Sequence, residues 1–175
     1  MRITTLDFAI LGLLLSGDKT AYAIRMIFKT TAMGNYSSSP GSIYPSTNKL
    51  KKLALIEQVS EKSGQLAITE AGKHQVKSWL NEPITEDMIA KSSEILILKF
   101  AFMDHLVSRQ DKLVFLRSFL EGSKSYLTNL ELYHQSASEE ELPLHGRLSF
   151  EFGMATLKTQ INWIKATLKT IEATS

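Results

Sequence analysis

Seven apolar residues near the carboxyl end of the chain recur at alternating spacings of four and three residues. They are Phe150, Met154, Leu157, Ile161, Ile164, Leu168 and Ile171. This period places them in one seam along a single face of a helix, as in a coiled coil. A helix with such a seam is expected to pack against another helix.

Two partners for this seam are open. One is residues 108–136 of the same chain, whose leucines keep near-heptad spacing. The other is a second subunit in addition to that segment. Nine aromatic residues lie between positions 100 and 163, and two or three helices cannot easily cover them all. We therefore expect a homodimer, with the seam residues as its dimerisation residues.

The overall composition is that of a globular protein with one domain or two small ones. The chain has 175 residues, of which 43% are hydrophobic and 22% charged, so extensive disorder is not expected. Cysteine is absent, which excludes disulfides and thiolate metal sites and is consistent with a reducing compartment. The apolar run at residues 8–15 is far shorter than the roughly 20 residues that cross a bilayer. We expect a cytoplasmic protein with no membrane partner.

The two halves of the chain differ in charge. Residues 1–75 hold nine Lys and Arg against five Asp and Glu, a balance of +4. The remaining residues hold 11 basic and 13 acidic side chains, a balance of −2. This difference gives weak support to an anionic partner for the first half.

Residues 37–57, SSSPGSIYPSTNKLKKLALIE, join hydroxyls and two prolines to a lysine-rich amphipathic run. Proline lacks an N–H group, so it is tolerated only in the first turn of a helix. The predicted helix therefore begins between Ser39 and Ile43, with Ser39 or Ser42 as its cap, and runs to about Ala54. Its inward face is expected to hold Ile43, Leu50 and Leu53. Its opposite side is expected to present Ser42, Ser46, Lys49 and Lys52.

The flanking segments predict further helices and a hairpin around this helix, which is the third in the chain. Thr4 or Thr5 is expected to cap a first helix, Thr20 a second and Thr69 a fourth. Two short alternating segments joined by Ser63-Gly64 predict a hairpin before the fourth helix. The predicted fold is mainly α with a small two-stranded antiparallel wing, a winged helix-turn-helix. In such a fold the third helix enters the major groove of DNA.

The basic side of the third helix has two interpretations. On charge alone, a solvated surface with ordinary lysines is favoured. Hydroxyls at a helix start, here with Tyr44, hydrogen-bond phosphate oxygens, while lysines supply a salt-sensitive attraction. Together with the predicted hairpin, these features favour double-stranded DNA as the partner.

Asn81-Glu82-Pro83 is the predicted boundary between a DNA-binding domain, residues 1–82, and a helical dimerisation domain, residues 83–175. In the second domain, Thr85 is expected to cap a helix that reaches about His105. Ser108 and Asp111 form a capping-box-like start for a long helix to about Ser136. An acidic connector at residues 136–143 precedes the helix that carries the seam.

Catalysis has little support in the sequence. The four histidines show no metal-ligand spacing such as HExxH, and no GxGxxG, GxxxxGK[ST] or GxSxG motif is present. We expect no enzyme activity, no cofactor, and no catalytic or metal site.

Three segments together resemble the PadR-like transcriptional regulators. AILGLLLSGDKTAYAI resembles the first two helices of that family, written ILGLL and GYEI. The third-helix segment is similar to the hallmark SPGSxYPxLxxLxxxGLI, with matches that include Ser39, Ser42, Tyr44 and Pro45. ITEAGKHQVKSWL resembles the family pattern LTxxGxxxLxxWL. These segments cover roughly residues 8–80, and the later helices more loosely resemble the larger branch that includes virulence activators.

The resemblance implies a dimeric winged-helix regulator whose carboxy-terminal helices dimerise. It also implies that, as in some members, a small aromatic effector or a second activator is a partner. Matching positions imply DNA contacts from Tyr22, Ser39, Ser42, Tyr44 and Lys49. With Ser46, Lys52 and the wing residue Lys62, these form the predicted DNA-binding set. The alternative for Tyr22 and Tyr44 is packing between helices with only the hydroxyls exposed.

The sequence departs from the family pattern at two places. Ala21 stands where the family usually has glycine, and QLAIT replaces a basic and aromatic wing strand. A nearly uncharged wing favours a rival interpretation, a winged-helix module that binds protein instead of DNA. Another interpretation is a ligand sensor with a pocket near Trp79, Phe102 and Trp163.

Overall fold

The structure is a computed structural model that describes residues 2–36, 40–60 and 63–173. Ser39 and Lys62 of the predicted DNA-binding set lie outside the described residues. The chain divides into two compact units. Unit 1 comprises residues 1–82 and 98–107, and unit 2 comprises residues 83–97 and 108–175.

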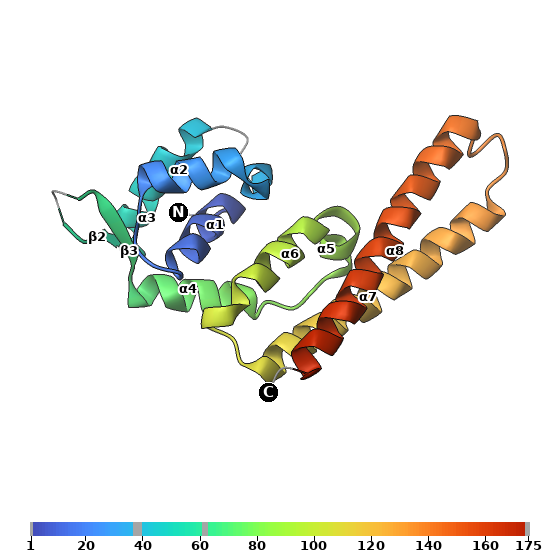
Figure 1. Ribbon diagram of the computed structural model, residues 1–175. Helices are drawn as coiled ribbons and strands as arrows, with labels where there is room; N and C mark the ends of the chain where they lie inside the picture. Colours follow the sequence, from blue (N-terminus) through green and yellow to red (C-terminus); the bar gives the residue numbers. More distant parts are fainter. Residues whose placement is uncertain (1, 37–39, 61–62, 174–175) are drawn as a thin grey trace. The chain divides into compact units, whose positions relative to one another are not determined.

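Unit 1 is a winged helix-turn-helix (Figure 1). Its helices are α1 (Thr5–Leu14), α2 (Ala21–Thr30), α3 (Ile43–Lys52) and α4 (Glu70–Leu80). Three 3-10 segments accompany them, η1 (Ala32–Tyr36), η2 (Pro40–Ser42) and η3 (Met103–His105). Its strands are β1 (Lys19–Thr20), β2 (Ile56–Gln58) and β3 (Gln65–Ile68). The helix order and the wing agree with the sequence prediction.

The wing belongs to a three-stranded antiparallel sheet with the order β1-β3-β2. In the predicted hairpin, Ile56 pairs with Ile68 and Gln58 with Leu66. The short β1 pairs with the other edge of β3, which the sequence did not predict. Thr20 ends this strand and also caps α2, its side chain accepting a hydrogen bond from the Ala23 N–H at 3.1 Å.

The core of unit 1 gathers apolar side chains from all four helices and the sheet. Its most buried members include Ile10, Leu11, Ile24, Ile43, Leu50 and Val76. Phe8 and Trp79 stack with ring centroids 4.5 Å apart. Phe102 packs so closely on α1 that a Cβ at Gly12 would lie 2.3 Å from its ring. Residues 98–107 are thereby tied to the winged helix.

Lys99 is a fully buried cation within unit 1. Its ammonium lies 3.2 Å from a Glu82 carboxylate oxygen and 5.3 Å from the centroid of the Trp79 ring. Burial lowers the pKa of Lys99, and the interaction with Glu82 only partly opposes this effect. A carboxylate and an aromatic face together compensate the buried charge.

Unit 2 is built on two long antiparallel helices, α7 (Arg109–Ser136) and α8 (Leu144–Ala173), which lie side by side in Figure 1. At one end the Arg109 guanidinium donates to the carbonyl oxygens of Ile171 and Glu172, at 3.0 and 2.6 Å. Arg109 therefore caps the carboxyl end of α8 from the start of α7.

The segment before α7 is more broken than predicted. Thr85 does cap a helix, but α5 (Glu86–Lys91) ends at Ser92, and α6 (Ser93–Ala101) then begins anew. The prediction of one helix to about His105 was therefore wrong. The two adjacent serines, 92 and 93, compete for backbone hydrogen bonds and weaken a continuous helix at this point. None of the described helices is both long and apolar enough to cross a bilayer.

Candidate nucleic-acid interface

The face that α3 turns inward is fixed by apolar and polar contacts together. Ile43 and Leu50 are fully buried in the core of unit 1. Between them lie two buried polar residues, Ser46 and Thr47. Thr47 donates from its hydroxyl to the Tyr44 carbonyl at 3.0 Å, whereas Ser46 reaches a carboxylate on another helix.

That carboxylate is Asp7, which is fully buried at the start of α1. Oδ2 accepts from the Thr4 N–H and hydroxyl, both at 2.7 Å, and from the Lys49 ammonium. Oδ1 accepts from the Ser46 hydroxyl. We call Thr4, Asp7, Ser46 and Lys49 the Asp7 cluster. It joins the first turn of α1 to the middle of α3.

Within the Asp7 cluster, the Asp7 side chain is held in its ionised form. Burial acts to raise the pKa of Asp7, but the hydrogen bonds from Lys49, Ser46 and Thr4 outweigh it. The pKa of Asp7 therefore lies below its ordinary value, and the carboxylate is charged at neutral pH. A buried carboxylate with donors on both oxygens holds α3 at one rotation about its axis.

Two residues of the predicted DNA-binding set therefore do not lie on the outward side of α3. Ser46 is only 7% exposed, and the Lys49 side chain only 17%. The prediction that they share an open face with Lys52 was wrong, because Ser46 lies on the face of the buried Ile43 and Leu50, and Asp7 supplies an acceptor there for Ser46 and Lys49. Lys49 also donates to the Arg2 carbonyl oxygen at 3.3 Å.

The outward face of α3 instead carries Tyr44, Asn48, Lys51 and Lys52, all of which are exposed. We call these four residues the α3 face. The Tyr44 side chain is 45% exposed, so it is not packed between helices. Asn48 and Lys51 were missed by the sequence analysis. They follow Tyr44 at helical steps of four and three residues, a signal that could have found them.

Other members of the predicted set have different surroundings. Tyr22, on α2, is 59% exposed. Ser42 precedes the first residue of α3 and is half-buried, and its side chain makes no capping hydrogen bond. The exposed side chains of the wing include Glu57 and Gln58 on β2 and Gln65 on β3. In its described part, the wing adds no cation to the α3 face.

The seam of α8 is covered within the chain itself. Met154, Leu157, Ile161, Ile164 and Leu168 are buried, and α7 is the element packed along α8. Phe150 and Ile171, at its ends, are half-buried. Of the two predicted partners, residues 108–136 of the same chain account for the seam. A second subunit packed on the seam in addition to this segment stays a prediction, because a heptad pattern defines an apolar face without defining every helix that covers it.

A second apolar surface remains exposed on α8. It includes Leu148, Phe152 and Trp163, of which Phe152 is 75% exposed. The small residues Ala155, Thr159 and Ala166 are exposed on the same helix at compatible helical spacings. We call these six residues the outer face of α8.

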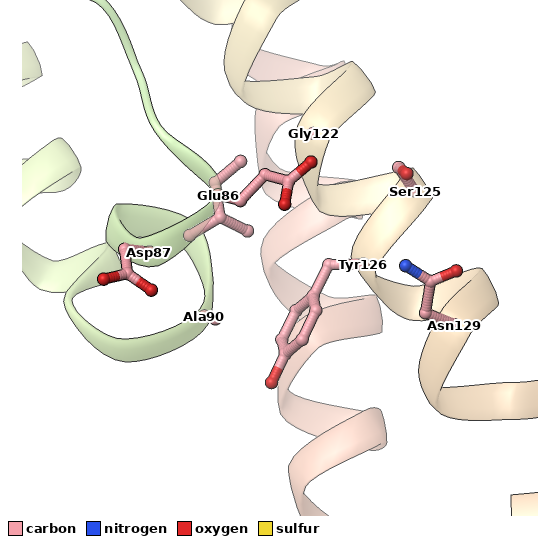
Figure 2. A pocket seen from close by; sticks show the side chains of 8 residues that line it. Glu86, Asp87, Ala90, Gly122, Ser125, Tyr126 and Asn129 are labelled. Atoms are coloured by element: carbon pink, nitrogen blue, oxygen red, sulfur yellow. The ribbon is translucent and has the colours of Figure 1, made fainter. Parts of the chain in front are cut away.

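Unit 2 also holds a cavity of about 320 Å³ between α5 and α7 (Figure 2). Glu86 and Asp87 lie at the start of α5, and Tyr126 and Asn129 project from α7. The carboxylates disfavour an aromatic acid, so this cavity gives no support to an effector of that kind. An aromatic effector and a second activator both stay predictions. Across the described residues, no group of three or more His, Asp or Glu is arranged to hold a metal ion.

Comparison with known proteins finds sequence similarity to bacterial transcriptional regulators. No protein-family model matches the chain. The negative transcriptional regulator PadR of Bacillus subtilis (strain 168) is 26% identical over 188 residues, spanning 98% of this chain and 99% of that protein. The chain is PadR-like.

Other similarities of this PadR-like chain are shorter or looser. The transcriptional regulator YqjI of Escherichia coli (strain K12) is 35% identical over 79 residues, which are 44% of this chain and 36% of that protein. The crystal structure of Bacillus subtilis PadR gives a TM-score of 0.44 with 25% identity, covering 96% of this chain and 95% of that one. The Vibrio cholerae virulence activator AphA gives 0.44 with 21% identity, covering 97% and 99%.

Proposed function

We propose that this PadR-like chain is a DNA-binding transcriptional regulator that acts as a homodimer with α3 in the major groove. The observation that carries the proposal is the α3 face, which presents a phenol, an amide and two ammonium groups on the third helix of a winged helix-turn-helix. Relatives that are themselves transcriptional regulators support a role that is not enzymatic. The proposed location is the cytoplasm, where bacterial DNA is found.

The chemistry of the α3 face fits a sugar-phosphate backbone. The ammonium groups of Lys51 and Lys52 supply charge that displaces counterions from phosphates. The hydroxyls of Tyr44 and Tyr22 donate hydrogen bonds to phosphate oxygens, which fixes the register of the protein on the duplex. Because Lys49 is held by Asp7, it is not among the proposed phosphate contacts.

The outer face of α8 is the proposed subunit surface. A face that exposes Phe152, Trp163 and Leu148 among small residues has the composition of a helix-packing surface. A two-fold dimer formed there would present two copies of α3 to successive major grooves, about 34 Å apart. An operator with approximate two-fold symmetry is therefore expected.

Binding of the full chain to duplex DNA tests this proposal. Duplexes are first selected from a random pool by the wild-type protein, and dissociation constants are then measured for wild type and variants. Lys51→Ala and Lys52→Ala are each expected to weaken binding several-fold, because each removes one phosphate contact from each subunit of the dimer. Lys165→Ala, which removes the same charge from α8, is the matched control and is expected to bind as wild type.

The same measurement separates the rival function. If the wild-type protein selects no DNA, the protein-interaction module is favoured and the regulator proposal is rejected. If DNA binds and all three lysine variants behave alike, the binding surface is not the α3 face.

A further inference from the structure

We propose that Asn48 is the specificity-determining residue of α3 and recognises an adenine through a pair of hydrogen bonds. The inference rests on the proposed DNA binding and goes beyond it, because it names the side chain that distinguishes one base pair from another. It rests on three observations: the rotation of α3, the chemistry of its exposed side chains, and the surroundings of the Asn48 amide.

The rotation of α3 places Asn48 opposite the core. Successive helical residues are turned by about 100°, so two residues are turned by about 200°. Asn48 lies two residues after Ser46 and two residues before Leu50, and both of these are buried. The Asp7 cluster and the apolar core thus agree on one orientation, which turns the Asn48 side chain to the outside.

The position of Asn48 within the α3 face is central. Tyr44 lies one helical turn before it, and Lys52 lies one turn after it. Tyr44 and the lysines at the end of the helix can contact the backbone on either side of the groove. A short side chain between them is placed to meet base edges when the helix lies in the groove.

The chemistry of the exposed side chains singles out Asn48. A lysine ammonium carries donors only, and a tyrosine carries one rotatable hydroxyl. The asparagine amide holds an acceptor and a donor in one plane. This arrangement matches the N6 donor and N7 acceptor of adenine, a pair that only adenine presents in the major groove.

The surroundings of Asn48 offer no structural role for this amide. Within the described part of the chain, the Asn48 side chain makes no hydrogen bond or ion pair. Asparagine is also a weaker helix former than alanine or the lysines beside it, so its presence in the middle of an exposed helix lowers helix stability. Asn48 therefore lowers helix stability and makes no hydrogen bond to a described residue that compensates for it, which makes it a candidate for a functional role.

The test compares Asn48→Ala with wild type on the selected operator and on a set of duplexes in which each base pair is changed in turn. Wild type is expected to lose on the order of 10- to 100-fold in affinity when one particular A·T pair is replaced. Asn48→Ala is expected to bind all four base pairs at that position about equally, and to be no less heat-stable than wild type by circular dichroism. Lys52→Ala is the control, and is expected to weaken binding to every duplex by the same factor.

The outcomes separate this inference from the proposed function. If wild type selects no DNA sequence, the proposed function fails and the inference fails with it. If wild type binds specifically and Asn48→Ala keeps the full base preference at every position, the inference alone is overturned.

Discussion

At the residue scale, a single buried carboxylate decides what the third helix presents. Asp7 is separated from Ser46 by 39 residues and from Lys49 by 42. Sequence reasoning assigned Ser46 and Lys49 to the wrong side of α3. Ser46 lies three residues after Ile43 and four before Leu50, so the helical period places it on the buried face. What the period cannot supply is the partner, Asp7, that accepts from both side chains.

Asp7→Asn is expected to destabilise the protein by about 3 kcal/mol at pH 7, because it leaves Lys49 without its buried counter-ion. The pKa of Asp7 is lowered in the folded state from its ordinary value of 3.8. Its contribution is therefore fully present above pH 3.8 and is lost as the pH falls through the folded value. Urea denaturation at pH 7 and at pH values below 3.8 measures both effects. Asp87→Asn, at an exposed carboxylate, is the control and should change stability by less than about 1 kcal/mol. An acid dependence equal in wild type and Asp7→Asn would contradict the role of Asp7.

Ala54 follows α3 with a φ of +55°, in the left-handed region that favours glycine. Ala54→Gly is expected to raise the free energy of unfolding by about 1 kcal/mol, because it relieves this strain. The matched control is Ala71→Gly inside α4, which should lower stability by about 1 kcal/mol. Chemical denaturation of the three proteins measures the difference, and a loss of stability in both variants would show that Ala54 is not strained.

At the element scale, the predicted caps and the hairpin formed, whereas a helix break and a third strand were missed. Side-chain caps form at Thr4, Thr20, Thr69, Thr85 and Ser108, as predicted, because a cap depends on residues three positions apart. The third strand, β1, escaped prediction because two residues carry no alternation and gain their order from β3. The seam of α8 was found by its period, and the predicted packing of residues 108–136 on it is confirmed, while an additional subunit at the seam stays a prediction. Periodicity indicates that one face of a helix is buried, whereas long-range packing determines which element covers that face.

The outer face of α8 carries a prediction of its own. Phe152→Glu is expected to leave the fold intact, because this side chain is 75% exposed in the single chain, and to convert a dimer to a monomer. Sedimentation equilibrium measures the mass. Val114→Glu, which places the same charge at an exposed apolar residue of α7, is the control and should stay dimeric. A dimer that persists in Phe152→Glu would place the subunit surface elsewhere.

At the scale of the whole molecule, the two units divide the proposed work. Unit 1 presents the α3 face. Unit 2 supplies the apolar surface of the proposed dimer, which therefore carries two copies of the α3 face. A dimer places four lysines of the α3 face, Lys51 and Lys52 from each copy, against phosphates. Four phosphate contacts correspond to a slope of about −3.6 in a plot of log affinity against log salt concentration.

The salt dependence of operator binding by the wild-type protein tests this account most directly. Dissociation constants measured between 50 and 300 mM salt are predicted to give a straight line with a slope between about −3 and −4. Lys52→Ala is predicted to reduce the slope by about 2, since each dimer loses two contacts. An affinity that does not change with salt would contradict recognition of the DNA backbone by α3.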